Sequence, residues 1–179
     1  MEPKVIVVDY KDNPMGEMNK SEAHASPNLH RAFSVFLHKD GRVLLQKRAK
    51  DKYHCGGLWT NTCCSHPRPG EETLEAARRR LWEEMKITAG DLEEIHSFVY
   101  YYSFPYGVTE FEYDHVIIGE YRGTFELNPE EAEEAAWVEK EELLQDMREN
   151  PQKYTPWFLI CAPEVAVSYT HLRAHETGR

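Results

Sequence analysis

The order of apolar and polar residues predicts a chain in which strands and helices are mixed. Runs rich in β-branched and aromatic residues predict strands over residues 5–10, 30–39, 42–47, 98–104 and 111–121. Asp40-Gly41 lies between the second and third of these runs and is a strong signal for a tight hairpin. Residues 53–70 are rich in glycine and proline, so we expect mainly loop there.

Helical periodicity marks the segments that lie between and after these strands. Residues 71–86 carry an apolar residue at every third or fourth position, which predicts an amphipathic helix with one buried stripe. The acidic stretch 129–149 predicts a solvated strand that leads into a helix over 139–149, and another short helix begins near residue 157. With no internal repeat and no long linker, these elements predict one α/β or α+β layered domain.

The end of the sequence differs from the rest. Residues 167–179 read VSYTHLRAHETGR, which does not continue the preceding pattern and resembles a translated sequencing-library adapter. We therefore expect a single domain over residues 1–166 and a non-native tail over 167–179. His171 and His175 lie in this tail and are left out of the candidate site.

Composition narrows the class of protein. The chain has 179 residues and no apolar run near the ~20 residues that a membrane helix needs. Its N-terminus is acidic at position 2 and lacks the features of a secretory signal. The formal net charge of −10 argues against a nucleic-acid partner, and four cysteines without a C-x-x-C pair indicate free thiols. We expect a cytoplasmic protein with no membrane partner.

The densest group of reactive residues is the motif WTNTCCSHP at 59–67. Cys64 and His66 lie two positions apart, so an extended backbone would turn both side chains to the same face. A thiol near imidazoles, a metal ion or basic groups can ionise below its free pKa of about 8.5. A buried cysteine beside a histidine that caps a turn has the same spacing, so this pattern alone leaves both interpretations open.

A second group combines carboxylates with imidazoles. Residues 110–114 read EFEYD, which places three carboxylates on one face of a strand, where they repel each other unless a cation lies between them. His24 and His30 flank a turn and, together with His66, would give a mixed nitrogen and oxygen site. Such ligands suit a transition-type divalent ion better than a structural zinc. A solvent-facing edge strand would show the same acidic pattern.

Basic residues supply a third group. Arg80 and Glu84 are four apart and share a helix face, either as a surface ion pair or as a site for phosphate and Mg²⁺. Arg48, Lys52 and Lys20 add cations that could hold a diphosphate.

Three segments, in order along the chain, resemble the type I isopentenyl-diphosphate isomerases. They are GEMNKSEAH at 16–24, TNTCCSHP at 60–67 and EFEYDH at 110–115, and the resemblance runs over roughly residues 5–160. It implies a Nudix-like sandwich, a mixed β-sheet flanked by helices. The Nudix signature helix appears as RRLWEE at 79–84, with Arg80 in place of the usual acid, which argues against nucleotide hydrolysis.

The resemblance also implies an activity: interconversion of isopentenyl diphosphate and dimethylallyl diphosphate through a tertiary carbocation, in isoprenoid biosynthesis. The implied catalytic residues are Cys64, Glu112 and Tyr100, with Glu112 and Tyr100 delivering a proton and Cys64 removing one. The implied ligands of a Mn²⁺ or Zn²⁺ ion are His24, His30, His66, Glu110 and Glu112, and Glu84 would help to hold Mg²⁺ on the substrate diphosphate. The implied substrate contacts are Lys20, Arg48, Lys52, Ser65 and Arg80, with Trp59 or Trp157 facing the cation.

Two other classes of protein stay open at this point. A Nudix-type diphosphate hydrolase is disfavoured by the altered signature helix. A zinc-stabilised module built on Cys63, Cys64 and His66 is disfavoured because adjacent cysteines chelate one zinc poorly. We expect a monomer or weak dimer whose partner is a small isoprenoid diphosphate.

Overall fold

The computed structural model describes residues 1–52 and 54–176, of which 169–176 are described by their backbone alone. Its elements follow in the order β1 (Lys4–Val8), β2 (Pro14–Asn19), α1 (Lys20–Ala25), β3 (His30–Lys39), β4 (Arg42–Arg48), β5 (Trp59–Thr60), β6 (Cys63–Ser65), α2 (Thr73–Met85), β7 (Glu93–Ser103), β8 (Thr109–Glu120), β9 (Ala132–Glu139), α3 (Lys140–Glu149), a 3-10 turn (Pro151–Lys153) and α4 (Pro156–Glu176).

One mixed sheet organises the molecule, with β3 at its centre. β3 pairs in parallel with β8 and antiparallel with β1, β4 and β6. β7 extends the sheet beyond β8, while β9 and β5 pair with β4. The parallel register runs from His30 opposite Glu112 to His38 opposite Glu120. This pairing brings together two segments that lie about eighty residues apart in the sequence.

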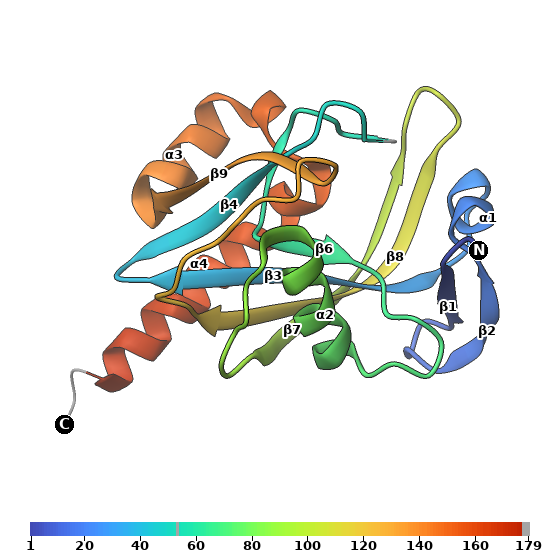
Figure 1. Ribbon diagram of the computed structural model, residues 1–179, viewed down its shortest axis with the longest axis horizontal. Helices are drawn as coiled ribbons and strands as arrows, with labels where there is room; N and C mark the ends of the chain where they lie inside the picture. Colours follow the sequence, from blue (N-terminus) through green and yellow to red (C-terminus); the bar gives the residue numbers. More distant parts are fainter. Residues whose placement is uncertain (53, 177–179) are drawn as a thin grey trace.

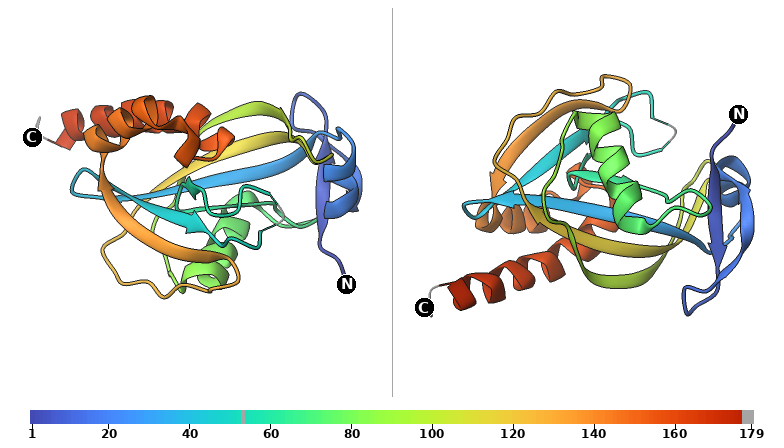
Figure 2. Two further views of the ribbon diagram at one scale, coloured as in Figure 1. Left: turned by 90° about the horizontal axis from the view of Figure 1, so that it is seen from above. Right: turned by 60° about the horizontal axis from the view of Figure 1, so that its bottom comes forward.

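Helices cover both faces of this sheet. Figure 1 and the left view of Figure 2 show α2 on one face and α3 with α4 on the other. Val35 and Ile117 pack toward α2, whereas their neighbours Phe36 and Val116 pack toward α4. Because burial on both faces favours continuous apolar runs, β3 and β8 are apolar at successive positions. The predicted α+β sandwich is confirmed.

The predicted amphipathic helix is α2. Ala77, Leu81 and Met85 are fully buried against the sheet, as their spacing predicts. The helix ends where Lys86 adopts a left-handed backbone with φ of 53° and its N–H bonds back to the last turn. Arg80 lies beside the buried stripe, so the same helix supplies both core and site residues.

Some elements differ from the prediction. The first strand ends at Val8 rather than residue 10, β7 begins at Glu93 rather than 98, and the loop over 53–70 contains β5 and β6. The segment 14–25, which had no predicted structure, forms β2 and α1. β2 is mostly exposed and is supported by its pairing with β1, so it carries no apolar pattern to detect.

The backbone does not mark the expected boundary after Ala166. α4 continues without interruption from Pro156 to Glu176, and residues 177–179 lie outside the described residues. The division into a native domain over 1–166 and a foreign tail stays a prediction. No described helix combines the length and the apolar content needed to cross a bilayer.

Packing of α4 on the sheet gives a test of the fold. Phe158 is fully buried and stacks on Phe36 and Tyr154, with ring centroids 5.9 and 5.5 Å away. Phe158→Ala should lower the free energy of unfolding by about 3–5 kcal/mol, measured by urea denaturation. Ile160, on the same helix and 51% exposed, provides the matched control, and Ile160→Ala should change stability by about 0.5 kcal/mol. Equal losses would show that α4 does not pack as described.

Candidate active site

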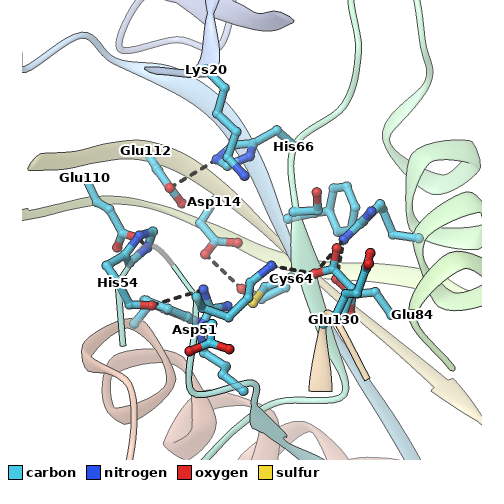
Figure 3. A pocket seen from close by; sticks show the side chains of 18 residues that line it. Lys20, Asp51, His54, Cys64, His66, Glu84, Glu110, Glu112, Asp114 and Glu130 are labelled. Carbon is cyan, nitrogen blue, oxygen red and sulfur yellow. Dashed lines mark hydrogen bonds and ion pairs between the residues drawn. The ribbon is translucent and has the colours of Figure 1, made fainter. Parts of the chain in front are cut away.

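A cavity of about 360 Å³ opens where β3, β6 and β8 meet the loops that precede β5 and β9. The predicted site residues that line it are Lys20, Arg48, Lys52, Cys64, Ser65, His66, Arg80, Glu84, Glu110, Glu112 and Trp157 (Figure 3). These residues come from α1, β4, β6, α2, β8 and α4 and from the segments that follow β4 and β6. The fold therefore gathers most of the predicted site into one place.

Strand register determines which side chains share this cavity. Ser34 on β3 is paired with Cys64 on β6, and Ala32 is paired with Asp114 on β8. Paired residues project to the same face of a sheet, and so do residues two apart on one strand. Cys64, Asp114 and Glu112 therefore lie on one face, and Ser34 Oγ donates a 2.9 Å hydrogen bond to Asp114 Oδ2.

Three imidazoles converge on one carboxylate. The Nε2 atoms of His24, His30 and His66 lie 3.9, 3.7 and 3.2 Å from Glu112 Oε1. One potential ligand atom from each of the four residues falls within 4.8 Å of the others. This is the arrangement of a divalent-metal site with nitrogen and oxygen ligands.

The tautomers of two of these histidines fit a metal. His24 Nδ1 lies 2.7 Å from the carbonyl oxygen of Lys20, and His30 Nδ1 lies 2.8 Å from that of Asn28. A carbonyl only accepts hydrogen bonds, so each Nδ1 carries the proton and each Nε2 presents its lone pair to the cluster. His30 Nε2 has no hydrogen-bond partner among the described residues. The residues present therefore fit a bound divalent ion.

The carboxylates on β8 differ in their electrostatic surroundings. Burial opposes ionisation of Glu112, yet the three histidines around its carboxylate hold its pKa well below the usual range. Burial, with Glu112 nearby, raises the pKa of Glu110 to about 8. Burial also raises the pKa of Asp114 well above its usual value. This face therefore holds more buried carboxyl groups than the neighbouring basic side chains can neutralise.

Glu110 does not belong to the convergent four. Its carboxylate instead contacts Nε2 of His54, a residue that sequence reasoning missed. His54 lies in the loop before β5 and shares no spacing with the other histidines, so no local signal could identify it. Asp51 and Glu131 also line the cavity without having been predicted.

The opposite side of the cavity is cationic, and its charges are paired. Arg80 Nη2 lies 2.6 Å from Glu84 Oε1 and 3.3 Å from Glu131 Oε2. Lys52 Nζ also lies 2.5 Å from Glu131 Oε2. Burial and the neighbouring cations lower the pKa of Lys20. An anionic ligand would therefore meet several basic groups that are already held in place.

The motif at 59–67 contains two thiols, Cys63 and Cys64, which lie on opposite faces of the sheet. Cys63 is fully buried against the α2 side, whereas Cys64 lines the cavity. Burial raises the pKa of the Cys64 thiol to about 12, and nearby Glu84, Asp114 and Glu112 add to the effect against Arg48. Without a bound ion, these surroundings favour the protonated thiol.

The three predicted aromatic residues differ in their position relative to the cavity. Trp157 lines the cavity and lies under the Arg48 guanidinium, 5.4 Å from ring centroid to Cζ. Trp59 lies outside it and packs on the core near α3 and Tyr154. Tyr100 is paired with Glu112 across β7 and β8, is 2% exposed and does not line the cavity. Its hydroxyl has no hydrogen-bond partner among the described residues.

Comparison with known proteins places this geometry in a family. A NUDIX domain model matches residues 28–158. Isopentenyl-diphosphate Delta-isomerase 2 of Aromatoleum aromaticum is 48% identical over 166 residues, which are 92% of this chain and 87% of that protein. The chain belongs to the isopentenyl-diphosphate isomerase family. The isopentenyl-diphosphate Delta-isomerase of Serratia proteamaculans is 46% identical over 169 residues, 94% of each chain.

Solved structures agree on the fold of this isomerase family member. DR0079 of Deinococcus radiodurans has a TM-score of 0.73 and covers 90% of this chain and 98% of its own, at 18% identity. A MutT NUDIX hydrolase from Burkholderia pseudomallei has a TM-score of 0.63 and covers 76% of this chain and 98% of its own, at 20% identity. At this identity the likeness concerns the fold alone.

The protonation of Cys64 can be measured in the metal-free protein. Because a thiol with a pKa of about 12 stays protonated well above neutrality, iodoacetamide should alkylate Cys64 at a rate that keeps rising from about pH 8 to pH 10. Mass spectrometry of the modified peptides gives this rate, with Cys63 and Cys161 as buried controls. A plateau near the free-cysteine pKa of about 8.5 would contradict the buried environment described here.

Proposed function

We propose that this chain interconverts isopentenyl diphosphate and dimethylallyl diphosphate in isoprenoid biosynthesis. The observation that carries the proposal is the placement of the Cys64 thiol and the Glu112 carboxylate on one face of the sheet, in one cavity with a cationic side. The names of the relatives from Aromatoleum aromaticum and Serratia proteamaculans support the same reaction.

The reaction requires two acid/base groups. A proton adds to the terminal carbon of the alkene and leaves a tertiary carbocation, and loss of a proton from the neighbouring carbon forms the new double bond. Before substrate binds, burial keeps a proton on Cys64, whereas histidines keep Glu112 ionised. The pair thus holds one transferable proton, so one group donates while the other accepts. With Glu112 as the donor, as expected from the sequence, that proton must first pass to Glu112.

The buried acidic face is the proposed metal site. His24, His30, His66 and Glu112 would hold a Mn²⁺ or Zn²⁺ ion, with Glu110 as a further ligand beside them. Such an ion supplies positive charge that stabilises buried carboxylates and polarises neighbouring groups. Glu84, on the other side of the cavity, would bind Mg²⁺ that arrives with the diphosphate.

The cationic side is the proposed diphosphate site. Arg48, Lys52 and Arg80 would exchange their present partners for phosphate oxygens, while Lys20 would add a further cation and Ser65 a hydroxyl. Trp157, which lines the cavity, would face the carbocation by a cation–π contact. Trp59 lies outside the cavity, and Tyr100, paired with Glu112 across β7 and β8, would assist proton delivery from beside it.

Other properties stay predictions: the cytoplasmic location, the monomeric or weakly dimeric state and the absence of nucleic-acid or membrane partners.

The reaction can be followed by NMR in D₂O with isopentenyl diphosphate, Mg²⁺ and Mn²⁺. Dimethylallyl diphosphate that carries deuterium should appear, because the added proton comes from an exchangeable group.

Cys64→Ala should lower turnover by roughly 10²–10⁴-fold, the scale of a lost acid/base group. Cys63→Ala, on the other face of β6, should keep most of the activity. Release of phosphate without the isomer would instead identify a hydrolase, and equal losses in both variants would refute the role of Cys64.

The diphosphate site makes a separate kinetic prediction. Arg48→Gln removes one charged donor, so KM for isopentenyl diphosphate should rise roughly tenfold or more while kcat changes less. Arg42, on the same strand and half exposed, gives the matched control, and Arg42→Gln should leave both constants unchanged. An unchanged KM in the Arg48 variant would remove this residue from the diphosphate site.

A further inference from the structure

Two glutamates on β8 share one face but have different partners. Glu112 faces the Nε2 atoms of three histidines. The Glu110 carboxylate instead contacts Nε2 of His54 (Figure 3). Glu110 is 3% exposed, and its Oε2 has no hydrogen-bond partner among the described residues. Buried polar atoms normally have a partner, so an unpaired carboxylate oxygen such as this one is available to bind an ion.

The two carboxylates belong to one neighbourhood. The His54 ring lies 5.9 Å from the His24 ring, centroid to centroid. Glu110 and Glu112 are two residues apart on the same strand face. His54 therefore connects Glu110 with the cluster formed by the three histidines and Glu112.

The local backbone is built to place His54. Gly57 N–H donates to the Arg48 carbonyl, and Arg48 N–H donates to that of Leu58, which closes the loop. Gly56 has to be glycine, because a Cβ there would lie 2.3 Å from the Lys50 carbonyl oxygen. Arg48 Nη2 also donates to the His54 carbonyl at 3.3 Å. These contacts hold Gly57, Leu58 and the His54 carbonyl against Arg48.

Aromatic rings fix the orientation of the imidazole. Phe104 lies 5.3 Å from the His54 ring, and Trp157 lies 6.0 Å away in an edge-on arrangement. The side chain is 9% exposed. An imidazole packed on two sides and aimed at a carboxylate is suited to hold that carboxylate in one orientation.

We propose that His54 is a positioning residue for the metal site, which holds one oxygen of Glu110 through Nε2 and leaves Oε2 to bind the divalent ion. This role rests on the proposed function only in taking the cluster as a metal site, and it deepens that proposal by adding a residue outside the ligand set. His54 Nε2–H donates to the Glu110 carboxylate and prevents it from turning away when an ion enters.

The test measures metal binding without substrate. Mn²⁺ is titrated into the metal-free protein, and the EPR signal of free Mn²⁺ gives the dissociation constant. His54→Ala should weaken binding roughly 10- to 100-fold, as expected for loss of a group that orients a ligand. His54→Gln, whose amide N–H can reach Glu110, should recover most of the affinity. His96→Ala is the control, since His96 is an exposed histidine outside the cavity.

Each outcome decides the proposal. Unchanged Mn²⁺ affinity in His54→Ala overturns it, and so does equal weakening in the Ala and Gln variants, which would make His54 a direct ligand. Circular dichroism confirms folding, and His54→Leu replaces the Ala variant if that one does not fold. The NMR assay is read separately: a wild-type protein that binds Mn²⁺ but forms no isomer refutes the proposed function and leaves the role of His54 standing.

Discussion

The burial of carboxylates on β8 is the constraint on which the rest of the site depends. Glu110, Glu112 and Asp114 are each at most 9% exposed, and ionised groups are costly to remove from water unless they are paired. The parallel pairing of β3 with β8 lowers this cost for Glu112, because it places His30 directly opposite that carboxylate. The other compensating groups come from α1 and from the loops before β5 and after β6.

This constraint explains why distant segments converge. The β1–β2 hairpin leads into α1, which carries His24 and Lys20 to the end of the sheet (Figure 1). The Asp12 carboxylate binds Arg31 and His115, which anchors that hairpin to β3 and β8. The N-terminal segment therefore contributes in two ways: Val5, Ile6 and Val8 of β1 are buried, and α1 supplies groups that neutralise the carboxylates.

The sequence predicted the parts of the fold and site that depend on local pattern. Apolar periodicity located α2, and the motifs at 16–24, 60–67 and 110–115 located the proposed ligands on α1, just after β6 and on β8. It could not locate His54, since its contact with Glu110 joins segments far apart and only the three-dimensional loop creates it. The choice between Trp59 and Trp157 was also non-local, because it depends on which side of β5 faces the cavity.

Strand parity explains why adjacent, chemically identical thiols have different fates. Successive residues of a strand point to opposite faces, so Cys63 packs against α2 and Cys64 enters the cavity. A slip of one residue in β6 would exchange them and turn a polar site residue into the core. Asn61 opposes such a slip by donating to the carbonyls of Val35 and Cys63, at 3.1 and 2.7 Å. The residues around the thiols thus secure the register on which the chemistry depends.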